Sequence, residues 1–226
     1  MTDARDHDDH GDHDDGADAP PLPGGDTLDL FPLRTVLFPG GLLNLKVFEA
    51  RYLDLVARCL RSGQGFGVVC LRQGAEAGKQ QRAVLFEPVG VWARLDEVDA
   101  EQAGILRVRC TGLERFRLLG APRQQADGLW QTAWESLPAD TPQVPGPALF
   151  DTVKALSNAI ASLRERNQLP FAEPFRLDDA GWVANRWCEL LPISLAAKQK
   201  LMELDDPAVR LSLVDGYLRD KRVVTD

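Results

Sequence analysis

The stretch from Leu28 to Val56, LDLFPLRTVLFPGGLLNLKVFEARYLDLV, places two Phe-Pro pairs inside an apolar run. Proline cannot donate a hydrogen bond to a strand ladder, and it breaks the interior of a helix. The run therefore predicts neither one central strand nor one helix. We expect short strands interrupted at Pro32 and Pro39, and Pro39 followed by Gly40 indicates a type II turn.

Residues 47–62 carry apolar side chains at helical spacing, which predicts one amphipathic helix ended by Gly63. Its apolar positions are Phe48, Tyr52, Leu55, Val56 and Cys59. Beyond it, short apolar runs continue to about Trp134 and predict strands, two of which meet at a turn near Thr111 and Gly112. Many short strands with a single helix indicate an α+β half built on a small barrel or sandwich.

The character of the sequence changes after a Pro-rich link at residues 138–147. Apolar residues then recur at intervals of three and four, which predicts a bundle of four helices over residues 148–220. Pro147 suits the first helical position, and short polar side chains can cap the later helices. The capping candidates are Asp178 or Asp179, Ser194, and Asp206.

The net charge of −8 is concentrated at the N-terminus. Residues 1–18 hold eight aspartates and one arginine, a balance of −7, so the remaining 25 basic and 26 acidic side chains leave −1. Residues 1–27 lack aromatic side chains, and we expect a disordered acidic tail there. His7, His10 and His13 could hold a divalent metal weakly, but a solvated tail is the favoured interpretation, and no metal or cofactor is expected.

The rest of the chain has no pattern typical of a metal site, a membrane span or a nucleotide site. Cys59, Cys70, Cys110 and Cys188 have apolar neighbours and no C-x-x-C spacing, so we expect buried, reduced thiols in a cytoplasmic protein. No window approaches 18 uninterrupted apolar residues, so no membrane partner is expected. GAEAGKQ at residues 74–80 matches a phosphate loop only loosely, because it is one residue short and lacks the Ser or Thr that binds magnesium.

All three histidines lie in the tail, which removes histidine-based catalysis from the body. Ser194 and Lys198 could form a Ser–Lys dyad, but a capping role for Ser194 is favoured, and we expect no catalytic residues. Seven arginines in the strand half could line a surface for RNA or another acidic partner, although local ion pairs on a solvated face are favoured. They are Arg34, Arg51, Arg94, Arg107, Arg109, Arg115 and Arg117.

Four stretches in this order, FPLRTVLFPGGLLNLKVFEARYLDLV, FGVV, VGVWARL and GLERFRLL, resemble the amino-terminal, substrate-binding domain of Lon proteases. LPISLAAKQKLMELDDPAVRL resembles the helical part that follows it in that family. The resemblance covers roughly residues 28–218 and implies a PUA-like β-barrel with one inserted helix, followed by a helical bundle. We therefore expect a barrel domain at 28–137, the link at 138–147 and the bundle at 148–220.

The chain reaches Asp226 without a phosphate loop or a peptidase domain, so the resemblance implies a stand-alone form without ATP hydrolysis or proteolysis. It implies a non-catalytic, proteolysis-associated module that binds exposed segments of protein or peptide clients, or a separate protease. The Phe-Pro-Gly opening would leave apolar side chains partly exposed, so Phe38, Leu42, Leu43 and Arg51 are the expected partner-binding residues. Two alternatives stay open: a PUA-like nucleic-acid-binding protein, which the near-neutral body disfavours, and an enzyme of unrecognised type.

Overall fold

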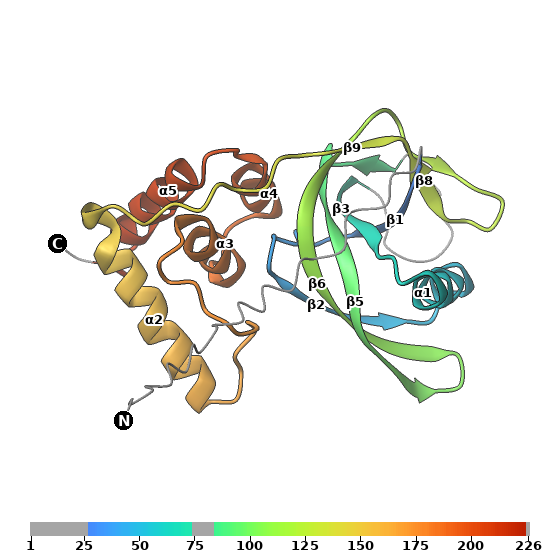
Figure 1. The fold of residues 1–226 in the computed structure, drawn as a ribbon, viewed down its shortest axis with the longest axis horizontal. Helices are drawn as coiled ribbons and strands as arrows, with labels where there is room; N and C mark the ends of the chain where they lie inside the picture. Colours follow the sequence, from blue (N-terminus) through green and yellow to red (C-terminus); the bar gives the residue numbers. More distant parts are fainter. Residues whose placement is uncertain (1–26, 74–83, 225–226) are drawn as a thin grey trace, which may run out of the picture.

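The computed structural model describes residues 27–73 and 84–224, and Figure 1 shows a sheet beside a group of helices. The first half of these ranges holds β1 (Leu28–Leu33), β2 (Leu42–Val47), α1 (Ala50–Ser62), β3 (Phe66–Gln73), β4 (Leu85–Phe86), β5 (Val89–Gln102), β6 (Ile105–Leu118), β7 (Arg123–Gln124), β8 (Trp130–Thr132) and β9 (Trp134–Ser136). The second holds a 3₁₀ turn (Pro147–Leu149), α2 (Phe150–Glu165), α3 (Ala180–Leu190), α4 (Leu195–Glu203) and α5 (Pro207–Asp220). The predicted tail at 1–27 and the loop at 74–80 fall almost wholly outside the described residues.

The strands pair in the order β2-β6-β5-β3-β1-β8-β7, with β4 beside β3 and β9 beside β6. The mixed α+β class and the inserted helix α1 are confirmed. The predicted closed barrel is wrong, because the end strands β2 and β7 do not pair with each other in the described ranges. A closed barrel has no edge strands, whereas β2 pairs only with β6 among the described residues.

The two Phe-Pro pairs behave differently. β1 continues through Pro32, contrary to the expected break. β8 pairs only with Leu28–Leu30, so beyond Leu30 that edge of β1 has no strand in the described part of the chain to which a backbone amide would donate, and a proline is tolerated. The expected turn at Phe38–Gly41 is confirmed: Gly40 has φ 71°, and the Gly41 amide donates to the Phe38 carbonyl at 2.9 Å. β2 begins directly after this turn, at Leu42.

The turn predicted near Thr111 and Gly112 is wrong, because β6 runs unbroken through both residues. A Cβ atom on Gly112 would come within 2.5 Å of the Phe38 carbonyl oxygen. Glycine is needed there because two backbones approach closely, and a glycine inside a strand is typical of such a contact.

The predicted N-terminal caps of the last three helices are confirmed. Asp179 accepts a hydrogen bond from the Gly181 amide at 2.9 Å and caps α3, and Ser194 accepts from the Ala197 amide at 3.1 Å and caps α4. Asp206 caps α5 in the same way. The first helix of the predicted bundle begins later than expected, because Pro147–Leu149 form a 3₁₀ turn before α2.

One apolar core continues from the sheet into the helices. Val91 on β5, Val183 on α3 and Leu211 on α5 are fully buried members of the same cluster. All four cysteines are free and buried, as predicted. The domain boundaries at 28–137, 138–147 and 148–220 stay a prediction.

Buried arginines tie the two halves together. Arg115 on β6 donates to the carbonyls of Met202 and Leu204 at 3.1 and 2.8 Å, and it pairs with Asp140 at 3.3 Å. Arg210 on α5 pairs with the same carboxylate. Both guanidinium groups are almost fully buried, so each relies on these partners for the hydrogen bonds that water would otherwise supply.

We expect Arg115→Ala to lower the free energy of unfolding by about 3–5 kcal/mol, because it leaves Asp140 and two carbonyls short of a donor. Arg117→Ala is the control two residues along β6: its pair with Glu135 is half exposed and is expected to contribute less than about 1 kcal/mol. Urea unfolding of both variants measures the difference. Equal losses would contradict a joining role for Arg115.

A third buried arginine holds the turn before β2. Arg186 on α3 donates to the carbonyls of Gly40 and Pro39, the latter at 3.0 Å, and to Glu189 at 2.8 Å. Burial lowers the pKa of Arg186 and raises the pKa of Glu189 to about 7, an increase that the charge of Arg186 opposes. The position of β2 therefore depends on a contact from the helical half.

The folded chain holds the Glu189 proton more tightly than a carboxyl of ordinary pKa 4.5 does, so protonation of Glu189 stabilises the fold. This contribution to the free energy of unfolding is complete below pH 4.5 and is lost as pH rises through about 7. Glu189→Gln, which imitates the protonated form, should remove that dependence. As pH rises from 5 to 8, we expect the free energy of unfolding of the variant to increase by about 1–3 kcal/mol relative to that of the natural chain. Urea unfolding at several pH values measures this difference. A difference between the two chains that stays constant from pH 5 to pH 8 would show that Glu189 does not titrate there.

Candidate functional site

A groove opens where the end of β1 and the edge strand β2 approach without pairing, and its volume is about 310 Å³. Its lining is mostly apolar, with polar side chains among the rest: Phe31, Leu33, Thr35, Leu43, Asn44, Leu45, Lys46, Val47, Phe48, Glu49 and Tyr52. It lies inside the Phe/Pro/Gly-rich stretch from which the sequence predicted a binding surface.

Aromatic packing holds the floor of the groove. Phe31 on β1 stacks on Tyr52 of α1 with ring centroids 4.1 Å apart, and its ring also lies 5.6 Å from that of Phe66. The Arg51 guanidinium lies over the Tyr52 ring at 4.6 Å and donates to the Gly128 carbonyl at 3.1 Å. The first turn of α1 is thus fastened to the sheet, and the groove has a preformed apolar base.

The rim of the groove is open to solvent. Phe48, between β2 and α1, is 57% exposed. Leu43 and Leu45 on β2 are partly buried and pack against the core, with Val47 fully buried beyond them. An exposed aromatic ring beside a preformed apolar floor is the kind of surface that marks an interaction site.

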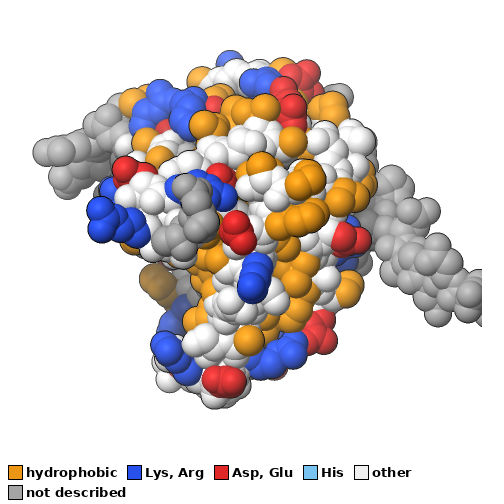
Figure 2. Space-filling model, turned by 90° about the vertical axis from the view of Figure 1, so that its left-hand side faces the viewer, with side chains coloured by type: hydrophobic (Ala, Val, Ile, Leu, Met, Phe, Trp, Pro, Cys, Tyr) orange, Lys and Arg blue, Asp and Glu red, His pale blue; other side chains and the backbone are white. Residues whose placement is uncertain are grey.

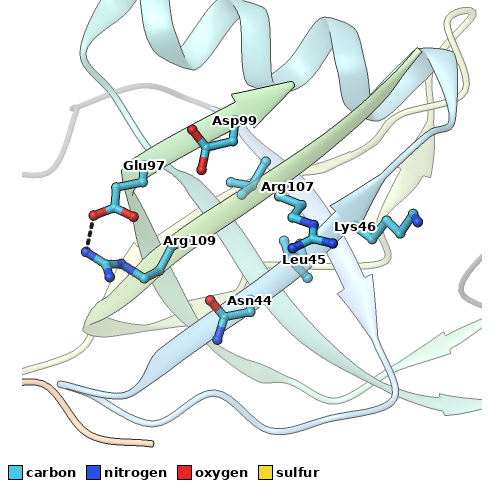
Figure 3. Close-up of a pocket in the computed structure, with 8 residues that line it drawn as sticks. Asn44, Leu45, Lys46, Glu97, Asp99, Arg107 and Arg109 are labelled. Carbon is cyan, nitrogen blue, oxygen red and sulfur yellow. Dashed lines mark hydrogen bonds and ion pairs between the residues drawn. The ribbon is translucent and has the colours of Figure 1, made fainter. Parts of the chain in front are cut away.

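A second hollow, of about 470 Å³, includes the exposed polar residues of β2 in its lining. Figure 3 shows the side chains that line it. Its lining comes from β2, β5 and β6: Asn44, Leu45, Lys46, Glu97, Asp99, Arg107, Val108 and Arg109. Arg109 pairs with Glu97, and Glu101 accepts from Arg107 at 3.0 Å and from Lys46 at 3.1 Å. These hydrogen bonds lower the pKa of Glu101. β2 therefore contributes to both an apolar groove and a charged hollow, and Asn44, Leu45 and Lys46 line both.

The favoured interpretation of the strand arginines, local ion pairs, is confirmed for six of the seven, and for Arg34 it stays a prediction. Besides the pairs above, Arg94 meets Asp96 at 3.0 Å and Arg117 meets Glu135 at 3.2 Å. Arg115 is buried and structural. Because these cations have carboxylate partners, they do not form the unpaired basic track that a nucleic acid backbone requires.

The four predicted partner-binding residues lie in three different environments: the core, the edge strand β2 and the inner side of the groove. Phe38 is fully buried, so the expectation that its side chain is partly exposed is wrong: the ring belongs to the core shared by the sheet and the helices. Leu42 and Leu43 are partly buried on β2, and Leu43 lines the groove. The Arg51 side chain is 9% exposed and bonds to Glu49 at 3.0 Å, so it supports the groove from inside. A binding role for the four residues stays a prediction.

The sequence missed Phe48 as a surface residue. It was assigned to the apolar seam of the first helix, but α1 begins at Ala50 with Glu49 in the N-cap position, which leaves Phe48 outside the helix. Leu45 was also missed. Its place opposite Val108 and between the exposed Asn44 and Lys46 is the period-two signal that could have identified it.

Candidate catalytic groups are used structurally. Ser194 caps α4, and the Lys198 ammonium donates to the Glu189 carbonyl at 3.1 Å, so the two do not form a dyad. Burial raises the pKa of Cys59 to about 11 and that of Cys188 to about 12, so neither is an activated thiol. Among residues 27–73 and 84–224, no three His, Cys, Asp or Glu side chains are grouped to hold a metal ion, and no helix could cross a bilayer.

Two other surfaces are weaker candidates for a binding site than the groove is. A hollow of about 540 Å³ lies between the sheet and the helical half, but two of its carboxylates, Asp140 and Asp179, are engaged by arginine and by a helix cap. Figure 2 shows hydrophobic side chains scattered over the helical end of the molecule, where Phe150 and Leu213 are exposed. Neither residue lines any of the described hollows.

The fold and the groove together define a mixed α+β domain with an open sheet edge, and comparison with known proteins agrees. The family model described as the ATP-dependent protease La (LON) substrate-binding domain matches residues 27–220. This chain belongs to that family.

Individual relatives are similar over most of this chain. A Lon protease of Desulfovibrio desulfuricans is 26% identical over 207 residues, which cover 88% of this chain and only 23% of the relative's length. The crystal structure of a Lon N-terminal domain protein from Xanthomonas campestris has a TM-score of 0.68 at 31% identity, covering 84% of this chain and 98% of that one. The N-terminal domain of a Mycobacterium avium complex Lon protease, at 17% identity and a TM-score of 0.55, covers 86% and 98% and supports the fold alone.

Proposed function

We propose that this chain is a recognition module that binds exposed apolar segments of unfolded polypeptides in the groove between β1 and β2. The observation that carries the proposal is the preformed apolar floor of Phe31 and Tyr52 beside the exposed Phe48, in a member of a substrate-binding family. A folded protein buries its apolar side chains, so such a groove selects segments that have lost or not yet gained structure.

The size of the groove sets the strength of binding. Each large apolar side chain that enters it gains about 1.5–3 kcal/mol, and ordering a flexible client opposes much of this. Dissociation constants on the order of micromolar to millimolar follow for a single segment. Weak, reversible binding suits a module that surveys many clients.

We propose that the module binds its clients without chemical change and passes them to a separate protease. The support is that Ser194, Lys198 and the buried thiols are all used structurally, and that its longer relatives include a Lon protease. The purified chain should neither hydrolyse ATP nor cleave casein. Turnover of either that is lost after one substitution in residues 28–220 would refute this part of the proposal.

Two finer predictions also stand as proposals. A PUA-like arrangement is supported by β8 and β9, which follow one another directly and pair with β1 and β6. A cytoplasmic location is supported by four free cysteines, since reduced thiols persist in reducing compartments.

We expect Phe48→Ala to weaken binding of reduced, carboxymethylated α-lactalbumin by about tenfold, because one truncated aromatic anchor at an interface typically costs 1–2 kcal/mol. Phe150→Ala is the matched control: Phe150 is equally exposed, at 57%, but lies at the start of α2 in the helical half. Fluorescence anisotropy of the labelled client measures both variants, with native α-lactalbumin as the folded comparison.

Equal weakening by the two substitutions would place client binding outside the groove. Binding of the native and unfolded forms with the same affinity would refute recognition of exposed apolar segments. A structured RNA that binds with strong salt dependence would instead support the nucleic-acid alternative.

A further inference from the structure

The outer edge of β2 has no strand partner among the described residues. β2 ends the pairing order of the sheet, and its neighbour on the other side is β6. An edge strand presents a row of free amide and carbonyl groups, which is a template for another extended chain. The groove opens beside this strand, since residues 43–47 contribute to its lining.

The ladder with β6 shows which groups point outward. The Gly112 carbonyl accepts from the Gly40 amide at 2.7 Å, and the Gly112 amide donates to the Gly41 carbonyl at 2.8 Å. In an antiparallel pair, hydrogen-bonded and non-bonded positions alternate, so Leu43, opposite Cys110, faces β6 with its backbone groups. The same alternation turns the amide and carbonyl groups of Asn44 and Lys46 to the outer edge.

The side chains of β2 alternate as well. Leu43 and Leu45 are partly buried and pack against the core, whereas Asn44 and Lys46 are exposed on the opposite face of the strand. A strand added to β2 would direct every second side chain toward the groove and the others toward the polar side. The alternation of partly buried and exposed side chains on β2 therefore favours an occupant whose apolar and polar residues alternate.

We propose that the client segment binds as an additional β-strand on the outer edge of β2, with apolar residues at every second position. This inference rests on the proposed function and adds the conformation and the residue pattern of the segment. The backbone amides of Asn44 and Lys46 supply hydrogen bonds that do not depend on sequence, and the groove supplies the preference for apolar residues. Neutral polar residues suit the intervening positions, which lie beside the exposed Asn44 and Lys46.

A client segment fits this edge better than a second copy of the chain does. Antiparallel pairing of two β2 strands centred on Lys46 would set like charges opposite each other, which destabilises a sheet, and each Lys46 side chain is 56% exposed. Pairing centred on Asn44 would set Lys46 opposite the apolar Leu42. Charged residues on an edge strand commonly prevent such self-pairing.

Asn44→Pro tests the strand addition, with Asn44→Thr as the matched control. Proline removes one outward amide, keeps the ladder to β6 and is tolerated on the free side of an edge strand, whereas threonine keeps the amide. The probe is a fluorescein-labelled eight-residue peptide in which valine or phenylalanine alternates with serine. We expect Asn44→Pro to bind it about tenfold more weakly than Asn44→Thr does, because one backbone hydrogen bond is lost.

Two N-methylated forms of the same peptide provide a test that does not depend on folding of the proline variant. One form carries methyl groups on the odd-numbered amides and the other on the even-numbered amides, so each blocks one edge of the peptide strand. We expect one form to bind the natural chain as the unmodified peptide does and the other to lose binding.

Equal binding of the two methylated forms, or equal binding by Asn44→Pro and Asn44→Thr, would overturn strand addition. If unfolded α-lactalbumin still depended on Phe48, the proposed function would stand without it; if nothing bound, both would fall. An Asn44→Thr dimer that dissociates in Asn44→Pro, seen by sedimentation, would assign the edge to a second copy and would also overturn the proposal.

Discussion

The position of β2 depends on one buried contact, the hold of Arg186 on the Pro39-Gly40 turn. Arg186 reaches from α3 and donates to two consecutive carbonyls of a turn that lies far away in the sequence. A guanidinium group is suited to this contact because its five donors are rigidly arranged and can serve neighbouring acceptors together. Since β2 begins directly after the turn, the helical half fixes where the open edge of the sheet lies.

This arrangement explains why helices follow the sheet in a domain whose proposed site lies on the sheet alone. Phe38, at the start of the turn, is buried in the core that both halves share, and Arg115 adds a second buried connection between them. The helices thereby hold a strand that has only one neighbour in the sheet formed by residues 27–73 and 84–224. An edge strand held in this way can remain available to a client without losing its register.

The local signals of one turn and of the helix caps were read correctly from the sequence. The Pro39-Gly40 turn and the caps Asp179 and Ser194 each involve atoms only a few residues apart, and turn and cap chemistry is local. The errors at Phe38 and Gly112 share one cause, because the Phe38 carbonyl lies against Gly112 and the Phe38 ring lies in the shared core. Contacts between distant segments leave no pattern in the local sequence. The groove was found only in part for the same reason: its floor joins β1 to α1.

The central claim is that unfolded polypeptide is recognised at the edge of β2, and amide hydrogen exchange tests it most directly. Exchange would be followed by NMR, residue by residue, with and without saturating reduced, carboxymethylated α-lactalbumin. The account predicts slower exchange at the outward amides of Asn44 and Lys46 when the client is bound, with the amides of α2 and α5 unchanged. Client binding that leaves Asn44 and Lys46 unchanged, or that protects only the helical half, would contradict it.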